Sequence, residues 1–187
     1  MKIIVDAMGG DHAPMEILKG CVDAVNEYNI NLTLVGQEDT IRKHLSTLNA
    51  PLEAFDIVNA SEIIEPDEPP VIAIRRKKDS SMVKGFEMLR QYPGSVFISA
   101  GSTGALMAGG LLRVGRLKGI SRPALAPLIP TKEKPVLLID AGANADCKPE
   151  NLVQFAIMGT VYMEKVLGRT NPTVGLVNIG TEEGKGN

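Results

Sequence analysis

The sequence predicts an α/β protein, a three-layer α/β/α sandwich in which helices cover both faces of a doubly wound, mostly parallel sheet. Two observations predict it: short apolar runs rich in β-branched residues recur along the chain, and stretches with helical spacing separate them. Most of these runs lack alternation with polar residues, which is typical of strands buried on both faces of a parallel sheet. Strands that alternate with helices require βαβ crossovers, and about six units of roughly 30 residues fit this chain.

We expect six strands, each an apolar run bounded by polar or turn residues. If all six join one sheet, its carboxyl edge collects the polar loops that follow them. In chain order the runs are Ile3–Val5, Leu32–Val35, Phe55–Val58, Val96–Ile98, Val136–Ile139 and Thr173–Ile179.

Helical spacing fills the gaps between the runs. In Met15–Tyr28 apolar side chains recur every three or four residues, and Pro14 occupies the first turn, where its missing N–H costs nothing. Two stretches break this alternation: the acidic Leu52–Pro70, which ends in a loop signal of two prolines, and the proline-containing Gly115–Pro135. The remaining predicted helices are Glu38–Leu48, Ser80–Gln91 with Asp79 or Ser80 as N-cap, Ser102–Val114, and Glu150–Leu167 closed by Gly168.

Composition narrows the functional class. The chain has 20 Lys and Arg against 22 Asp and Glu, a formal net charge of −2, and no Trp, so nucleic acid is a poor candidate partner. A 44% hydrophobic content suffices for a core, and 187 residues predict a single domain, residues 1–187. Cys21 and Cys147 fit neither a disulfide framework nor a C-x-x-C motif, so we expect two buried thiols in a reducing cytoplasm.

No segment indicates export or a membrane span. Asp6 interrupts the N-terminal apolar run too early for a signal peptide. The uncharged stretch Gln91–Leu112 has the length of a span, but its serines and glycines divide it into a strand, a turn and a helix. The last residues, Asn178–Asn187, have the pattern of a strand end, a loop and the opening of a helix, and we therefore expect this chain to be the N-terminal part of a longer protein.

Glycine and small polar residues follow the carboxyl ends of four predicted strands, where open parallel sheets bind ligands. The strongest candidate is Ser99–Gly104, because a strand, a Gly-Ser-Thr-Gly turn and a helix present backbone N–H groups and hydroxyls to an anion. An alternative is that the glycines permit tight packing, a role that suits Gly109 and Gly110 better. The other loops are Asp6–His12, Asp140–Asn144 and Gly180–Glu182.

His12, in a glycine-flanked turn, is a candidate general acid or base, with a capping or structural role as the alternative. Asp6, Asp140 and Asp146 could hold a divalent ion if they converge, but Asp also caps helices at such loops. We expect no metal and no cofactor. No P-loop, G-x-G-x-x-G or G-x-S-x-G motif occurs, so a nucleotide cradle, a dinucleotide fingerprint and a covalent serine lack support.

Two basic groups are candidates for steering an anionic partner, although a solvated face is the usual role of such runs. The first leads into Asp79 and a helix start, so it could also hold a phosphate. The groups are Arg75-Arg76-Lys77-Lys78, and Arg113, Arg116, Lys118 and Arg122.

These motifs together resemble the bacterial phosphate acyltransferase family of phospholipid synthesis, the PlsX family. Ser102 departs from the SAGNTGAL form of that family, but a hydroxyl still donates to an anion. Six blocks in the same order carry the resemblance: DAMGGDHAP (residues 6–14), PPVIAIRRKKDSSM (69–82), SAGSTGAL (99–106), RPALAP (122–127), DAGAN (140–144) and NIGTEEGKGN (178–187).

The resemblance implies transfer of a fatty acyl group from acyl carrier protein to inorganic phosphate, which gives an acyl phosphate. It also implies a fold like that of isocitrate and isopropylmalate dehydrogenases, a homodimer, and a cytoplasmic enzyme that can associate peripherally with the membrane.

That chemistry needs no covalent enzyme intermediate, because phosphate is a nucleophile and a thioester has a good leaving group. We expect Lys78 or a neighbouring base to neutralise the phosphate, Asn144 or another loop donor to face the developing oxyanion, and His12 to protonate the departing thiolate. Two residue sets complete the assignment. The phosphate ligands are Ser99, Gly101, Ser102, Thr103 and Gly104, and the residues that dock the acidic carrier protein are Arg75, Arg76, Lys77, Arg113, Arg116, Lys118 and Arg122.

Three alternatives stay open. The first is a phosphotransacetylase-like enzyme that uses acyl-CoA. The second is an inactive module that binds phosphate or an acyl ligand. The third, an oxidoreductase of the same fold, has less support because no acidic metal cluster and no cofactor fingerprint appear.

Overall fold

The computed structural model describes residues 1–177, and the residues divide into two compact units, Met1–Leu117 (unit 1) and Lys118 onward (unit 2). The single domain expected over residues 1–187 stays a prediction. The motif at residues 178–187 lies outside the described residues.

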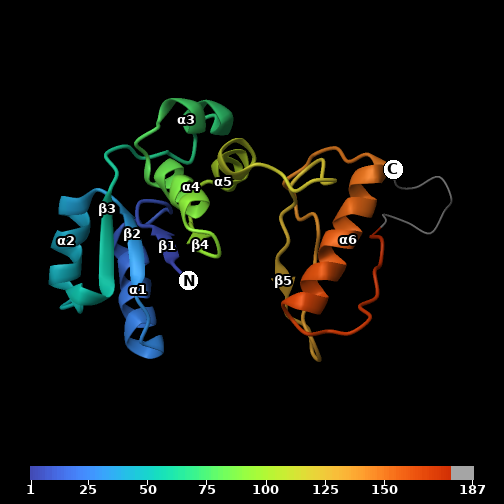
Figure 1. Cartoon of the computed structure of the whole chain (residues 1–187), viewed down its shortest axis with the longest axis horizontal. Helices are drawn as coiled ribbons and strands as arrows, with labels where there is room; N and C mark the ends of the chain where they lie inside the picture. Colours follow the sequence, from blue (N-terminus) through green and yellow to red (C-terminus); the bar gives the residue numbers. More distant parts are fainter. Residues whose placement is uncertain (178–187) are drawn as a thin grey trace. The chain divides into compact units, whose positions relative to one another are not determined.

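Unit 1 is built on a four-stranded parallel sheet in the order β3-β2-β1-β4 (Figure 1). Its strands are β1 (Ile3–Asp6), β2 (Leu32–Gly36), β3 (Phe55–Asn59) and β4 (Val96–Ile98). In register, Val5 of β1 lies beside both Leu34 and Ile98. All four were predicted as strands, and the parallel sheet is confirmed.

Helices cover both faces of this sheet, as three layers require. On one face α1 (Met15–Tyr28) and α2 (Glu38–Thr47) pack against the odd-numbered side chains of β1. On the other face α4 (Ser81–Gln91) contacts β1 and β2, and Phe86 meets Phe97 of β4 edge to face, with ring centroids 5.1 Å apart. The core on the α1 side contains Val5, Leu18, Val22, Val25, Leu34, Ile41 and Leu45, all buried.

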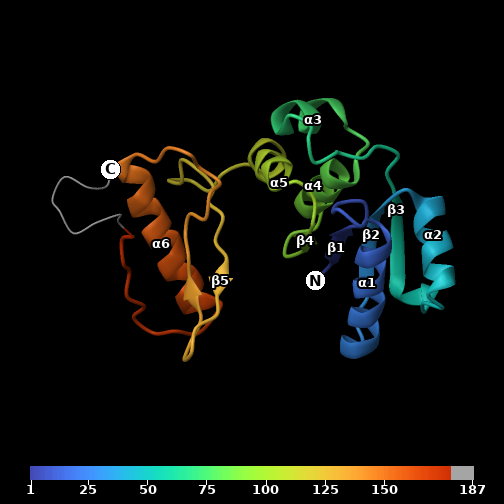
Figure 2. The same cartoon turned by 180° about the vertical axis from the view of Figure 1, so that it is seen from behind.

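The end of unit 1 is closed by α3 (Pro70–Arg76), α5 (Thr103–Gly109) and the π-helical turn η2 (Gly110–Val114) that continues α5 (Figure 2). The prediction of a helix over Ser102–Val114 is therefore confirmed, with Ser102 as its N-cap. In contrast, α3 was not predicted. Its Pro70 stands at the first helical position, where proline is well tolerated, so the two prolines begin a helix instead of extending a loop.

Unit 2 has a different architecture from the one predicted. Residues of the expected fifth strand form β6 (Val136–Leu137), which pairs antiparallel with β5 (Leu128–Ile129) in a hairpin and does not extend the parallel sheet. The expected sixth strand is also wrong as far as it is described, because residues 173–177 form no strand. The six-unit parallel sheet is thus corrected to four parallel strands and one short hairpin within residues 1–177.

The long helix α6 (Pro149–Lys165) organises unit 2. Its Phe155 and Met163 are buried, and a Cβ on Gly159 would lie 3.4 Å from Ile139, so the helix packs closely on the segment after β6 at this position. At its start Asn151 accepts a hydrogen bond from Lys148 N. Gly168, in the left-handed region at φ +63°, follows the helix as predicted.

Among residues 1–177, no helix combines the length and apolar character that crossing a bilayer requires.

Candidate functional site

Two glycine-rich loops of unit 1 meet where β1 and β4 end side by side. Asp6, the last residue of β1, is 1% exposed. Its Oδ2 accepts a hydrogen bond of 2.8 Å from the Ser99 hydroxyl, and its Oδ1 accepts one of 3.1 Å from Met8 N. The Ser99 oxygen in turn accepts from Gly101 N at 3.1 Å. A chain of hydrogen bonds therefore joins loops that are more than 90 residues apart in the sequence.

Glycines allow the two loops to approach this closely. A Cβ on Gly9 would lie 2.5 Å from Asp6 Oδ2, 2.9 Å from Ser99 Oγ and 3.0 Å from Gly101 N. A Cβ on Gly101 would lie 3.3 Å from the Gly9 Cα atom. A side chain on Gly9 would therefore collide with the carboxylate, the hydroxyl and the amide that form this chain of hydrogen bonds, so the position requires glycine.

The rest of the Ser99–Gly104 loop begins α5. Ser102 is the N-cap, and its hydroxyl oxygen accepts from Ala105 N at 3.3 Å. Thr103 and Gly104 are exposed and form the first turn, whose amides have no carbonyl partner within a helix. A Cβ on Gly104 would lie 2.8 Å from Pro70 Cγ, so this loop also packs against the start of α3. The packing role was predicted for Gly109 and Gly110, and only Gly109 has it, against Phe86.

His12 is exposed in the turn that precedes α1, and its carbonyl accepts from Glu16 N. Its loop touches the Ser99–Gly104 loop, because a Cβ on Gly10 would lie 3.4 Å from Ala100. The structure thus brings the His12 loop beside the predicted anion loop.

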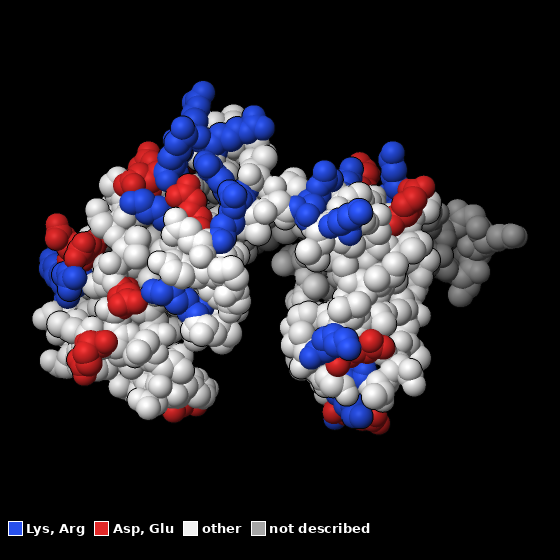
Figure 3. All heavy atoms as spheres, in the orientation of Figure 1, with Lys and Arg blue, Asp and Glu red and all other residues white. Residues whose placement is uncertain are grey.

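In the basic group Arg75–Lys78, three side chains are exposed and one is bound to other residues of unit 1. Arg75, Arg76 and Lys78 are exposed at the end of α3, where Lys and Arg side chains gather (Figure 3). Lys77 points inward instead: its Nζ donates to Ile63 O and to the carboxylate of Glu68. This bond, with the Glu65 amide, holds the pKa of Glu68 below its usual range.

The turn after this group is tied to the loop that follows β3. Asp79 accepts from the Lys84 ammonium at 2.6 Å and from both the hydroxyl and the amide of Ser61. These donors hold the pKa of Asp79 well below its usual range. The carboxylate of Glu62 accepts from Asp79 N, so the turn that carries Lys78 is anchored on both sides.

The second basic group is split between the units. Arg113 in unit 1 donates to Ile74 O at 2.8 Å, which joins η2 to α3, and Arg116 is exposed in the same unit. Lys118 and Arg122 belong to unit 2, where Arg122 donates to Asp146 O.

The Asp140–Asn144 loop is held by hydrogen bonds within itself and to residues 123–125 of unit 2. Burial raises the pKa of Asp140, but donors from Leu125, Asn144 and Ala143 outweigh it and lower the pKa overall. The side-chain amide of Asn144 donates to Asp140 Oδ2 at 3.1 Å and to Pro123 O at 2.9 Å. Both of its hydrogens are therefore used within unit 2, and the predicted oxyanion donor is occupied in this conformation.

Neither a metal centre nor a reactive thiol emerges from the described residues. Across residues 1–177, no three His, Cys, Asp or Glu side chains lie close enough together to hold a metal ion. Cys21 is buried as predicted, and burial raises its pKa to about 11, which makes the thiol unreactive. Cys147 is only half-buried.

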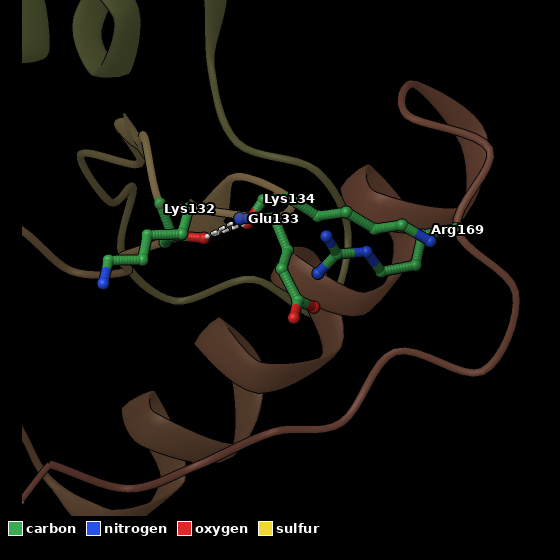
Figure 4. A pocket seen from close by; sticks show the side chains of 5 residues that line it. Lys132, Glu133, Lys134 and Arg169 are labelled. Carbon is green, nitrogen blue, oxygen red and sulfur yellow. Dashed lines mark hydrogen bonds between the residues drawn. The ribbon is translucent and has the colours of Figure 1, made fainter.

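A surface hollow of about 540 Å³ lies in unit 2 between the β5–β6 turn and the segment after α6 (Figure 4). It is lined by Thr131, Lys132, Glu133, Lys134 and Arg169, none of which was a predicted site residue. Arg169 donates to Pro135 O, and Thr131 to Lys134 O, so these contacts brace the turn.

Sequence reasoning missed three contributors to the unit 1 site: the orienting role of Asp6, the close packing of Gly9, and Pro70 at the start of α3. Asp6 was noted only as a metal or capping candidate. A signal did exist, because a carboxylate at the end of a buried strand needs donors, and the neighbouring strand ends in Ser99.

The chain is similar to known proteins over its whole length. The family model described as "Fatty acid synthesis protein" matches residues 1–187. A phosphate acyltransferase of Clostridium tetani is 54% identical over 187 residues, which is 100% of this chain and 56% of the relative. Similar proteins of the same name occur in Clostridium novyi (52% over 188 residues, 57% of the relative) and Thermoanaerobacterium thermosaccharolyticum (54% over 187 residues, 55% of the relative). The chain spans about half the length of the curated relatives it matches.

Proposed function

The chain belongs to the fatty acid synthesis protein family, and on that premise we propose that the whole protein transfers a fatty acyl group from acyl carrier protein to inorganic phosphate. One observation carries the proposal: every residue of the chain aligns with relatives named phosphate acyltransferase. The product is an acyl phosphate, an activated intermediate for phospholipid synthesis.

The geometry of unit 1 supports a phosphate site at the Ser99–Gly104 loop. The Ser99 hydroxyl donates its proton to Asp6 and cannot also donate to phosphate. The donors left for phosphate are the hydroxyls of Ser102 and Thr103 and the first amides of α5. Gly101 and Gly104 keep side chains away from the bound anion. Lys78, exposed at the anchored turn before α4, supplies the neutralising positive charge.

In the proposed reaction a phosphate oxygen attacks the thioester carbonyl carbon, the C–O bond forms, and the C–S bond then breaks. The thiolate of the carrier protein leaves and takes a proton from His12, an exposed residue of the loop that lies beside the phosphate loop. Because both Asn144 hydrogens are occupied, we assign the oxyanion to another loop amide, and Asn144 organises the loop that contains Asp140.

The acidic carrier protein docks, in this proposal, on exposed basic residues. Within unit 1, Arg75 and Arg76 at the end of α3 are the main candidates, together with the exposed Arg116. Lys118 and Arg122 of unit 2 are candidates from the sequence pattern alone. Lys77 and Arg113 contribute indirectly, because their side chains bind backbone carbonyls of the protein itself.

The resemblance further supports a homodimer in the cytoplasm that associates peripherally with the membrane. Light scattering during size-exclusion chromatography tests the dimer, and co-flotation with anionic vesicles tests the membrane contact. A monomer, or failure to float at low salt, contradicts the respective proposal.

The decisive assay uses the full-length natural gene product. It measures phosphate-dependent thiol release from long-chain acyl carrier protein and from the matching acyl-CoA, side by side. We expect release from the carrier protein only when phosphate is present. Release from acyl-CoA alone supports a phosphotransacetylase-like enzyme, and thermal stabilisation by phosphate without any turnover supports a binding module.

A further inference from the structure

We propose that Asp6 is the positioning residue of the Ser99–Gly104 loop, which it orients through the hydroxyl of Ser99. The inference rests on the proposed function, since it assigns the loop a phosphate ligand. Asp6 itself touches no substrate in this scheme. Its effect on the reaction passes through Ser99 to the backbone at Gly101 and on to the donors that follow.

The chemistry of the three groups gives the hydrogen bonds one direction. An ionised carboxylate only accepts, so the Ser99 hydroxyl must donate to Asp6 Oδ2, which leaves the lone pairs of its oxygen for Gly101 N. A charged acceptor makes the first bond stronger than a neutral one. The second carboxylate oxygen is held by Met8 N at 3.1 Å, so the carboxylate cannot rotate without losing a partner.

Burial and packing keep this arrangement rigid. Asp6 is 1% exposed, and the Ser99 hydroxyl and the Met8 amide are the donors that stabilise its carboxylate. Gly9 closes over the carboxylate, the hydroxyl and the Gly101 amide at once, and leaves no room for a methyl group. A buried carboxylate held in this way costs stability unless its donors remain in place.

A fixed loop matters because acyl transfer to phosphate depends on where the bound phosphate is held. Misplacement of a binding group by about 1 Å can reduce a rate a hundredfold. Ser99 is the first residue of the loop. Its hydroxyl oxygen binds the amide of Gly101, the residue directly before the N-cap Ser102. A change of the Asp6 carboxylate therefore moves the proposed phosphate donors without removing any of them.

The first test compares Asp6→Asn with the unaltered full-length protein. Asparagine has the same size, but its NH₂ group would donate to Ser99, so the hydroxyl proton would no longer be held by residue 6. We expect KM for inorganic phosphate to rise on the order of tenfold while KM for the acyl carrier protein substrate stays within about twofold. Loss spread equally over both KM values would overturn the positioning role.

Ser99→Ala and the double variant provide the second test, and they keep the proposal falsifiable if Asp6→Asn folds poorly. Because Asp6 acts through Ser99, the double variant should be no worse for phosphate than Ser99→Ala alone. Additive effects of the two changes contradict the inference. Hydrogen exchange of the Gly101 amide should also accelerate in Ser99→Ala, and unchanged protection contradicts it without reference to activity.

A glycine pair supplies the matched control. Gly9→Ala should raise KM for phosphate, whereas Gly20→Ala in α1, where a Cβ meets nothing within 4 Å, should leave it unchanged. The proposed function fails separately, if the unaltered protein releases thiol independently of phosphate. With phosphate-dependent release intact, wild-type phosphate KM in folded Asp6→Asn and Ser99→Ala overturns this inference alone.

Discussion

The carboxylate of Asp140 accepts both amides of Asn144: the backbone N at 2.8 Å and the side-chain Nδ2 at 3.1 Å, both on Oδ2. Leu125 and Ala143 donate to the other oxygen. The pair holds together a loop that joins distant parts of unit 2, and it makes that loop sensitive to the protonation of one residue.

Acid should weaken unit 2 through Asp140. Its pKa is lowered in the folded chain, so its contribution to stability is present above the unfolded value of about 3.9 and is lost as pH falls through the lower folded value. We expect Asp140→Asn to flatten the loss of melting temperature between about pH 5 and pH 2.5. Circular dichroism melts across this range measure it, and an unchanged slope in the variant contradicts the assignment.

Gly109 should tolerate no side chain, because a Cβ there would lie 2.1 Å from the ring of Phe86. Phe86 is itself held against Phe97, so the ring cannot simply move away. We expect Gly109→Ala to cost about 1–3 kcal/mol of unfolding free energy in urea.

The neighbouring Gly110 is the matched control for Gly109, since a Cβ there meets nothing within 4 Å and its φ is −54°. Gly110→Ala should be neutral or should stabilise by up to about 1 kcal/mol. Equal losses in the two variants would show that helix geometry, and not contact with Phe86, explains both glycines.

Arg76 and Lys77 are sequence neighbours that should respond differently to substitution. Arg76→Ser should leave the melting temperature unchanged but raise KM for the carrier protein and reduce its dependence on salt, because the guanidinium is exposed. Lys77→Ser should cost about 1 kcal/mol of stability, because Ile63 O and Glu68 lose their donor.

Lys43→Ser, on the exposed side of α2, controls for the loss of one positive charge elsewhere in unit 1. If it raises KM for the carrier protein as much as Arg76→Ser does, docking does not depend on the end of α3. A large loss of stability in Arg76→Ser would also contradict the assignment.

Ser80 should be an important N-cap. It is fully buried, its oxygen accepts from Val83 N at 3.3 Å, and its hydroxyl donates to Lys77 O at 2.8 Å. Ser80→Ala should cost about 1–2 kcal/mol. Ser46→Ala, at an exposed position in α2, should have no such cost, and chemical denaturation of both variants compares them.

Local patterns predicted most of unit 1. The strands β1 to β4 and the helices α1, α2 and α4 lie within a residue or two of the predicted bounds, because each presents a clear apolar run or helical period. The start of α4 is similarly well marked, and Ser80 was correctly expected among its N-cap candidates. These features depend on residues that are close together in the sequence, so the sequence pattern was enough to predict them.

Unit 2 was harder to predict. The apolar run at Val136–Ile139 looks like a buried parallel strand, yet only two residues pair, and they pair with Leu128–Ile129. Burial decides between such outcomes, and burial depends on which distant residues arrive to cover the run. Helix α3 was missed because Pro70 marks a loop and a first helical turn equally well.

The sequence by itself determined the α/β class and the family, and it predicts the loop at Ser99–Gly104 as the leading candidate for an anion site. Only the tertiary structure decided which polar groups are already engaged: Ser99 by Asp6, Lys77 by Glu68, and Asn144 by Asp140 and Pro123. The physical reason is that a motif specifies which donors and acceptors exist, whereas their partners are chosen by folding, which brings together residues as far apart as Asp6 and Ser99.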